Sequence, residues 1–201
     1  MSAELGRLAA ALKARGVAPR QIDTIFLTHV HRDHFGGLVN DDGAAAFPNA
    51  QVVLHEKEAA FWLDSRLEDM PQRARRYRDI ARNTLALYAD RLRRVKDSEE
   101  VSGVTAQLAP GHTPGHTCWL IESGGQAMLA WGDLIHLAPI HLPSPHIAME
   151  YDLDPATALR SRRRVLDWVA TDHILVAGAH LPAPGIGAIV RNGTAYAYEP
   201  Q

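Results

Sequence analysis

Apolar residues recur at helical or strand-like intervals along most of the chain. Leucines spaced three or four apart predict an amphipathic helix over residues 4–14. Asp154 and Pro155 have the residue types of an N-cap and a first helical position, and they predict a longer helix that ends near Val169. Short apolar runs predict buried strands at 22–28, 50–54, 104–109 and 173–178. Because strands alternate with helices, we expect an α/β fold.

Two further pairs of strands are separated by turn-forming residues. Gly124 and Gly125 lie between the apolar segments 117–123 and 126–133, which predicts a β-hairpin. Asn192-Gly193 predicts the turn of a second hairpin within residues 186–199.

Residues 57–95 differ from the rest of the chain because they are rich in charged residues and in residues that favour helices. We expect two helices that break near Met70-Pro71 and form an insertion in a single domain spanning residues 1–201. The arginine-rich stretch at 73–78 (RARRYR) is typical of a solvated helix face.

The composition excludes several classes of protein. The 201 residues are 46% hydrophobic and 22% charged, as in globular domains. With 21 Lys+Arg against 23 Asp+Glu the net charge is -2, so we expect no nucleic-acid partner. No apolar run reaches the roughly 18 residues of a membrane helix, and residues 1–16 do not resemble a signal peptide. We therefore expect no membrane partner; the sequence as given would be cytoplasmic, but its location stays open. Cys118 is the one cysteine, which excludes an internal disulfide.

The densest chemical signal is the stretch THVHRDH at 28–34. His29 and His31 are two residues apart at the end of a predicted strand, so their imidazoles lie on one side and can bind one metal ion. Asp33 and His34 lie beyond the strand end, where they can face a second ion. Imidazole and carboxylate ligands suit Zn²⁺ first, with Mn²⁺ or Fe as alternatives. Leaving such side chains buried without partners would cost about 1–3 kcal/mol each, which argues against a purely structural role.

Three later segments add polar residues at the ends of predicted strands. GHTPGHT at 111–117 contains His112, WGD ends at Asp133, and VAGAH ends at His180. Open sheets place functional groups at strand ends of this kind.

Together these segments resemble the metal-binding motifs of the metallo-β-lactamase superfamily, in the same order, over residues 22–191. Stretches such as AFPNAQVV, GDLI and HLPAPGIGAI are more similar to its methyl parathion hydrolase-like branch. The resemblance implies an α/β fold of the α+β type, a four-layer αββα sandwich. That fold normally has several strands before the first histidine motif, and only 28 residues precede His29. The resemblance thus implies an N-terminally truncated chain with an exposed sheet edge, and a missing segment that could have held a secretion signal.

The resemblance also implies a dinuclear centre. The ligands of the first ion would be His29, His31 and His112. Those of the second ion would be Asp33, His34 and His180, and Asp133 would bridge both.

Such a centre would be the cofactor of a hydrolase. Two divalent ions, Zn first, lower the pKa of a bridging water from about 15.7 toward neutrality. The resulting hydroxide would attack a small ester, lactone or phosphotriester, and Asp33 would be catalytic by orienting it. A glyoxalase-type thioesterase is one alternative, for which Arg32 and the arginines of 72–76 hint at a basic groove. A non-catalytic metal-binding remnant is the other. We expect a small-molecule substrate, and the resemblance suggests a homodimer.

Several residues are candidates for supporting roles. Thr28, Thr113, Thr117 and His116 are placed to bond the second nitrogen of a ligating imidazole, although His116 is also suited to bonding within its own loop. His136 would either line the substrate pocket or lie outside it. Trp62 would either face that pocket or pack in a helical core.

Overall fold

The computed structural model describes residues 8–201, which divide into two compact units. The first unit consists of the chain up to Leu54 together with Ala59–Arg94, and the second consists of His55–Glu58 together with Val95–Gln201. Each unit has its own cluster of buried apolar side chains. Residues 4–7 of the first predicted helix lie outside the described residues. The single-domain prediction stays a prediction.

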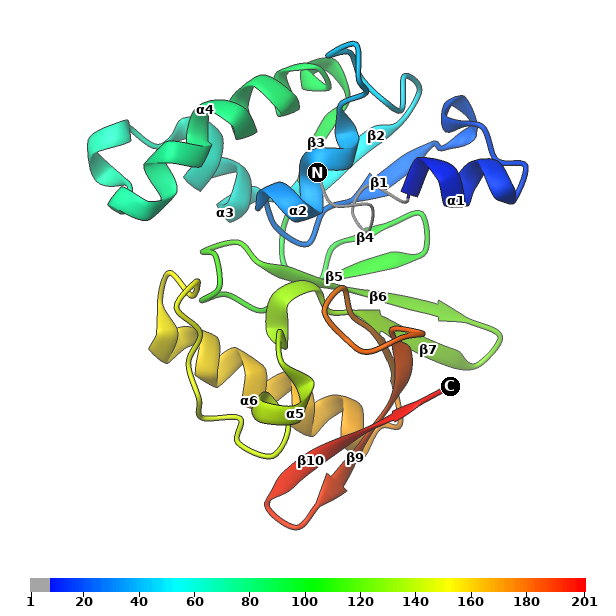
Figure 1. The fold of residues 1–201 in the computed structure, drawn as a ribbon, viewed down its shortest axis with the longest axis vertical. Helices are drawn as coiled ribbons and strands as arrows, with labels where there is room; N and C mark the ends of the chain where they lie inside the picture. The colour runs from blue at the N-terminus through cyan, green and yellow to red at the C-terminus, as the bar shows by residue number, and fades with distance from the viewer. Residues whose placement is uncertain (1–7) are drawn as a thin grey trace. The chain divides into compact units, whose positions relative to one another are not determined.

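The first unit is built on a three-stranded sheet in the order β1-β2-β3 (Figure 1). The strands are β1 (Thr24–Phe26), β2 (Gln51–His55) and β3 (Leu92–Val95). The helices along residues 8–86 are α1 (Leu8–Ala14), α2 (Arg32–Phe35), α3 (Glu56–Ala59) and α4 (Gln72–Ala86). β1 and β2 run parallel, with Ile25 opposite Val52. In the part of the chain that the structure describes, β1 is therefore an edge strand of this sheet.

The core of the first unit contains two large aromatic side chains that are fully buried. Trp62 and Tyr88 are fully buried there beside Leu85. The phenol of Tyr88 donates a hydrogen bond to the carbonyl of Leu38 at 2.8 Å and accepts one from the amide of Phe47 at 3.1 Å. Because both bonds go to loop backbone, Tyr88 ties those loops to the core without leaving a buried hydroxyl unpaired.

The second unit contains a seven-stranded sheet in the order β10-β9-β8-β7-β6-β5-β4. The strands are β4 (Glu100–Val101), β5 (Val104–Leu108), β6 (Thr117–Ser123), β7 (Gln126–Ala130), β8 (Leu175–Ala177), β9 (Ile186–Asn192) and β10 (Ala195–Pro200). Its longer connections carry α5 (Ala138–His141) and α6 (Pro155–Thr171). β7 and β8 are parallel, and the other neighbouring strands of this sheet are antiparallel.

The two predicted hairpins form in this sheet. Ser123 pairs with Gln126, and Gly124 and Gly125 between them have φ of 58° and 75°, which a type I′ turn requires of both residues. In the second hairpin Asn192 pairs with Ala195, so the turn consists of residues 193–194, one position later than predicted.

α6 packs its apolar side on the sheet of the second unit (Figure 1). Its start is as predicted, because the Asp154 carboxylate accepts a hydrogen bond from the amide of Thr157 at 3.0 Å and Pro155 is the first helical residue. Val165, Leu166 and Val169 are buried in the core of the second unit, to which β7, β8 and β9 also contribute apolar side chains.

Two strands and two short helices were not predicted. β3 lies at the end of the segment predicted to be helical, and α2, β4 and α5 lie where neither a helix nor a strand was expected. The sequence LRRV of β3 has no strong strand preference of its own, so its conformation depends on pairing within the sheet. The predicted break near Met70-Pro71 is confirmed, since α4 begins directly after it at Gln72.

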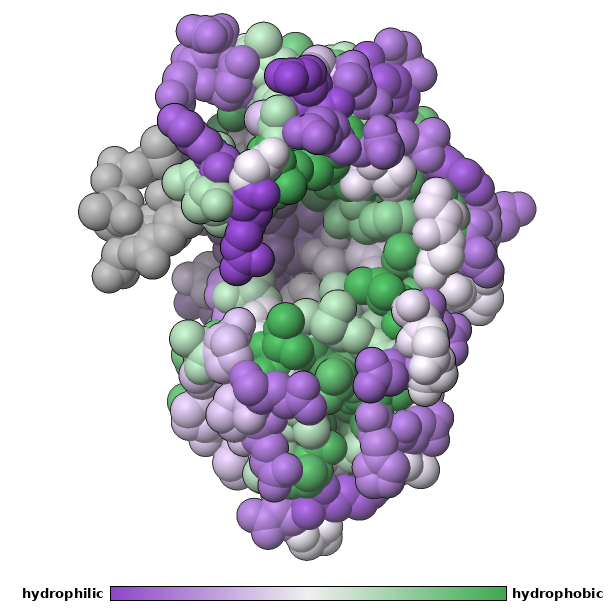
Figure 2. All heavy atoms as spheres, turned by 90° about the vertical axis from the view of Figure 1, so that its right-hand side faces the viewer, coloured by the Kyte–Doolittle hydropathy of each residue, from purple (hydrophilic) through white to green (hydrophobic). Residues whose placement is uncertain are grey.

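One face of the molecule is shown in Figure 2, with hydrophilic residues (purple) along its outline and hydrophobic residues (green) gathered between them. Within residues 8–201, no helix has both the length and the hydropathy needed to cross a bilayer.

A buried arginine of α6 forms hydrogen bonds with the connection that contains residues 134–147. Arg162 is 1% exposed although it lies on the apolar side of the helix. Its Nε donates to the carbonyl of Leu134 at 2.9 Å, and its Nη1 donates to those of Pro145 at 3.2 Å and Ile147 at 2.6 Å. The guanidinium also lies 3.6 Å from the carboxylate of Asp152. One side chain thus satisfies backbone groups across residues 134–147.

Replacing Arg162 with Met should lower the free energy of unfolding by about 3–5 kcal/mol, because a buried carboxylate and several carbonyls would lose their partner. Urea denaturation measures the change. Arg163 is exposed on the same helix, so Arg163→Met is the matched control and should shift stability by less than about 0.5 kcal/mol. Equal denaturation midpoints for the two variants would contradict this role of Arg162.

Candidate metal centre

In the first unit, three imidazoles gather where the chain leaves β1. The ring centroid of His29 lies 4.7 Å from that of His31 and 4.2 Å from that of His34. The hydroxyl of Thr28 lies 3.1 Å from Nδ1 of His29. Nε2 is then the atom through which His29 can bind a metal ion. The predicted supporting role of Thr28 is consistent with this contact.

The short helix α2 brings the last two residues of the motif back toward the first. His31 is the residue before the helix, and Asp33 and His34 lie within its single turn. A carboxylate oxygen of Asp33 lies 3.4 Å from Nε2 of His34. The Asp33 side chain is 59% exposed and that of His34 is 10% exposed, so the carboxylate is the solvent-facing member of this group.

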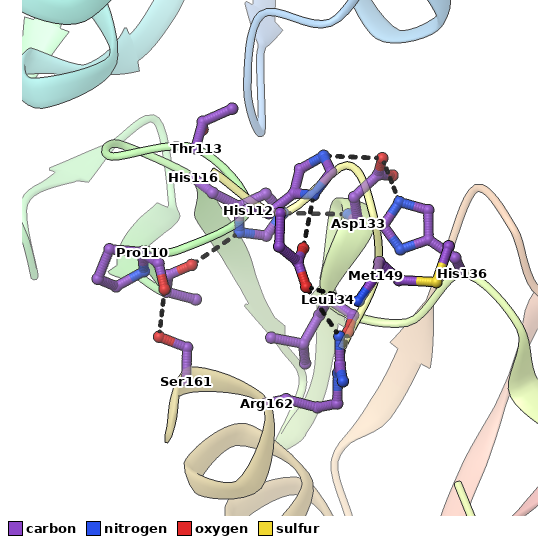
Figure 3. A network of polar contacts seen from close by, with 12 residues as sticks. Pro110, His112, Thr113, His116, Asp133, Leu134, His136, Met149, Ser161 and Arg162 are labelled. Carbon is purple, nitrogen blue, oxygen red and sulfur yellow. Dashed lines mark hydrogen bonds and ion pairs between the residues drawn. The ribbon is translucent and has the colours of Figure 1, made fainter. Parts of the chain in front are cut away.

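In the second unit, the carboxylate of Asp133 is surrounded by imidazoles (Figure 3). Its Oδ2 lies 3.2 Å from Nε2 of His112 and 3.0 Å from Nε2 of His136. Its Oδ1 lies 3.2 Å from Nε2 of His180. Ligand atoms of Asp133, His136 and His180 all lie within 4.8 Å of one another. Imidazole nitrogen and carboxylate oxygen are ligands that zinc takes in proteins, so these residues fit a divalent ion.

The register of the sheet explains why these residues meet. Ala130 of β7 lies opposite Ala177 of the parallel strand β8, and Asp133 and His180 each follow three residues later. β5 and β7 both pair antiparallel with β6, so β5 runs in the same direction as β7. The loop with His112, which follows β5, therefore leaves the sheet at the same end.

His116 fixes the backbone at Asp133. Its Nε2 accepts a hydrogen bond from the amide of Asp133 at 3.0 Å, which places the ring proton on Nδ1, 3.1 Å from the carbonyl of Ala109. The imidazole is thus the neutral tautomer, and it contacts the turn that presents the carboxylate. The two contacts of its ring nitrogens therefore give His116 a structural role in the loop.

The Nδ1 atom of His112 contacts a second carboxylate, different from that of Asp133 (Figure 3). Its Nδ1 lies 3.0 Å from Oδ1 of Asp152, whose other oxygen accepts from the amide of Met149 at 3.1 Å. Burial alone would lower the pKa of His112, but hydrogen bonds and charge from Asp133 and Asp152 outweigh it and raise that pKa. Burial likewise opposes ionisation of Asp152, yet the hydrogen bond from His112 and the neighbouring positive charge keep its pKa below the ordinary value. A carboxylate behind a ligating histidine fixes the ring orientation and tautomer.

A buried glutamate holds the loop that carries His112. The hydroxyl of Thr113 donates to Oε2 of Glu58 at 2.6 Å, and the amide of Gly115 donates to the same oxygen at 3.0 Å. The hydroxyl of Thr117 donates to the carbonyl of Gly115 at 2.8 Å. Thr113 and Thr117 therefore bond groups of the loop and Glu58 instead of the imidazole nitrogens suggested for them. A Cβ atom on Gly115 would lie 2.0 Å from the amide nitrogen of Glu58, so only glycine fits this approach.

The predicted ligands thus form one group in each unit. The residues grouped in the first unit are His29, His31, Asp33 and His34, and those grouped in the second are His112, Asp133 and His180. The convergence of both groups on one pair of ions stays a prediction. Trp62 is fully buried in the core of the first unit, and its ring lies nearly perpendicular to that of the candidate ligand His31, with centroids 6.0 Å apart.

Sequence reasoning missed Asp152, Glu58 and Arg162. The burial of Arg162 could have been predicted, because the residue shares a helical face with Val165, Leu166 and Val169, where a charged residue must have buried partners. The roles of Glu58 and Asp152 could not be predicted from local sequence, since their partners lie 55 and 40 residues away in the chain.

The chain belongs to the metallo-β-lactamase superfamily, whose family model matches residues 1–184. Two solved structures are similar over nearly the whole chain. The hydrolase AbOPH, described as a member of the beta lactamase superfamily, is 33% identical with a TM-score of 0.92, covering 99% of this chain and 71% of that one. AidC, described as a dizinc quorum-quenching lactonase in complex with a product, is 30% identical with a TM-score of 0.91, covering 100% of this chain and 71% of that one.

A curated relative is an N-acyl homoserine lactonase of Bacillus cereus, which is 30% identical over 122 residues. That alignment covers 60% of this chain, and the chain spans 41% of the length of the relative. These similarities confirm the predicted α/β sandwich of the superfamily. The methyl parathion hydrolase-like branch and the N-terminal truncation stay predictions.

Replacing Gly115 with Ala should destabilise the protein by about 1–3 kcal/mol, because the added methyl group would collide with the backbone of Glu58. Thermal or urea unfolding measures this. At Gly36, φ is −59° and a Cβ atom would meet nothing within 4 Å, so Gly36→Ala is the control and should leave stability unchanged or raise it. If both variants unfold like the wild type, the close approach at Gly115 is not a packing constraint.

His141 predicts a pH dependence of stability. The side chain is fully buried, and its Nδ1 accepts hydrogen bonds from the amides of His136 and Leu137, each at 3.3 Å. Burial, followed by the positive charge of Arg162, lowers the pKa of His141 to about 4 from 6.5. The unfolded chain takes up a proton below pH 6.5 that the folded chain resists, so stability should fall as the pH drops from 6.5 toward 4.

The control for this effect is His141→Asn, which keeps an acceptor at the same place but does not titrate. Urea midpoints measured between pH 4 and 6.5 should decrease more steeply for the wild type than for the variant. Parallel curves would show that His141 does not carry the effect.

Proposed function

We propose that the chain is a metal-dependent hydrolase of small carboxylic esters or lactones. The observation that carries the proposal is the nearly buried Asp133 carboxylate, with imidazole nitrogens of His112, His136 and His180 at 3.0–3.2 Å. A carboxylate among imidazoles is a donor set for a catalytic divalent ion, zinc above all. Membership of the metallo-β-lactamase superfamily supports the same chemistry.

The ligand groups of both units would hold two divalent ions, as the order of the sequence motifs implies. When bound, the ions would supply a nucleophilic hydroxide at neutral pH and an electrophile for the substrate oxygen. Asp152 and Arg162 would keep His112 oriented, and His116 would keep the Asp133 turn in place. Asp33, the exposed carboxylate of the first unit, would accept a hydrogen bond from the attacking water.

The similar proteins favour a lactone over the other substrates. AidC is described as a dizinc lactonase, and the Bacillus relative as an N-acyl homoserine lactonase, which supports a lactone and zinc for this chain. The phosphotriester rests on the resemblance to the methyl parathion hydrolase-like branch and is part of the same proposal. A homodimer is likewise a proposal.

The thioesterase alternative has weaker support. It requires a basic groove, but arginines of α4 bond backbone carbonyls of the preceding segment. Arg75 donates to the carbonyls of Met70 at 2.8 Å and Glu68 at 3.0 Å, and Arg82 donates to that of Trp62 at 3.1 Å. These side chains stabilise the entry into the helix, so fewer of them remain to bind a charged substrate.

Wild-type protein loaded with zinc should contain two equivalents of metal and hydrolyse a homoserine lactone or a p-nitrophenyl ester. Asp133→Ala should lose metal and at least about 100-fold in turnover, because the variant lacks the carboxylate on which the imidazoles converge. Elemental analysis and initial rates measure the two effects, with a phosphotriester and a glutathione thioester as further substrates. Asp172→Ala, at an exposed position after α6, is the control and should match the wild type. Equal turnover by Asp133→Ala and the wild type would contradict the proposal.

A further inference from the structure

We propose that His136 is a metal ligand, so that the second unit alone completes a binding site for one divalent ion. The inference deepens the proposed function, because it uses the same carboxylate, Asp133. The proposed site differs from the two-ion centre because it needs no residue of the first unit. His136 is not among the ligands that the family resemblance implies.

The geometry at His136 is that of a ligand beside Asp133. The two residues are three apart, and the turn Gly132–Leu134 brings Nε2 of His136 to 3.0 Å from Oδ2 of Asp133 (Figure 3). The side chain of His136 is 10% exposed. Ligand atoms about 2.0–2.1 Å from a tetrahedral zinc lie roughly 3.4 Å apart. The Nε2–Oδ2 contact is a hydrogen bond in this structure, and the two atoms would have to separate by only about 0.4 Å to bind one ion.

The neighbouring imidazoles hold the ring in this position. The His136 ring stacks on that of His180, with centroids 5.1 Å apart and planes 15° apart. Its centroid also lies 5.0 Å from that of His112. Ligand atoms of Asp133, His136 and His180 all lie within 4.8 Å of one another, so one carboxylate and two imidazoles of the second unit would bind one ion and leave its fourth tetrahedral position open.

The second nitrogen distinguishes His136 from His112. Nδ1 of His112 is held by Asp152, whereas Nδ1 of His136 is buried and has no hydrogen-bond partner among residues 8–201. No outer carboxylate or carbonyl therefore strengthens His136 as a ligand. We expect it to contribute less to affinity than His112 does, and to matter most when the ligands of the first unit are removed.

The experiment removes those ligands and counts metal. A variant with His29, His31, Asp33 and His34 replaced by Ala should still bind one equivalent of Zn²⁺ in competition with a chromophoric chelator. It should also give the visible absorption of tetrahedral Co²⁺. Adding His136→Ala should weaken Zn²⁺ binding about 10-fold or more. Adding His146→Ala, which removes an exposed histidine of the same connection, should leave the affinity unchanged.

Two results would overturn the proposal: a folded four-fold variant that binds no ion, or equal affinities after His136→Ala and His146→Ala. If the four-fold variant does not fold, the single variant His136→Ala in the otherwise native chain decides the question. Its Co²⁺ spectrum should change in intensity, and an unchanged spectrum would contradict ligation by His136. A failed hydrolase assay would leave these outcomes intact, because they count bound metal and not turnover.

Discussion

The second unit depends on a carboxylate that is buried among imidazoles. Asp133 is 4% exposed, and an ionised carboxylate at such a position is stable only if hydrogen bonds or positive charge replace the water it has lost. The three imidazoles at its oxygens meet that demand, and a divalent ion would meet it more fully. The surrounding structure keeps the groups together. His116 binds the backbone of Asp133, Asp152 binds His112, Arg162 binds Asp152, and Glu58 binds the loop between His112 and His116.

The residues around Asp133 are constrained by their contacts to different degrees. Arg162 anchors backbone carbonyls as well as a carboxylate, so it couples the position of Asp152 to the packing of α6 on the sheet. Gly115 allows the loop to approach Glu58 more closely than any side chain would permit. The imidazole of His136, in contrast, is held by its contact with Asp133 and by stacking on His180.

Local sequence signals predicted the elements whose structure is decided locally. The N-cap at Asp154, the Gly124-Gly125 turn and the position of His29 and His31 after a strand all depend on residues a few positions apart. Asp133 and His180 could be predicted from their places after strands, and the pairing of β7 with β8 explains why they meet. β3, Glu58 and Asp152 could not be predicted in this way. Their conformation or partners are set by segments tens of residues away, which no local pattern encodes.

The most direct test of this account is the zinc X-ray absorption spectrum of the metal-loaded protein. We predict a first shell of nitrogen and oxygen at about 2.0–2.1 Å, with the outer-shell scattering of several imidazoles and no sulfur, because Cys118 is buried in the core of the second unit. A shell of oxygen alone, without imidazole scattering, would show an ion bound elsewhere and would contradict the assignment of these histidines as ligands.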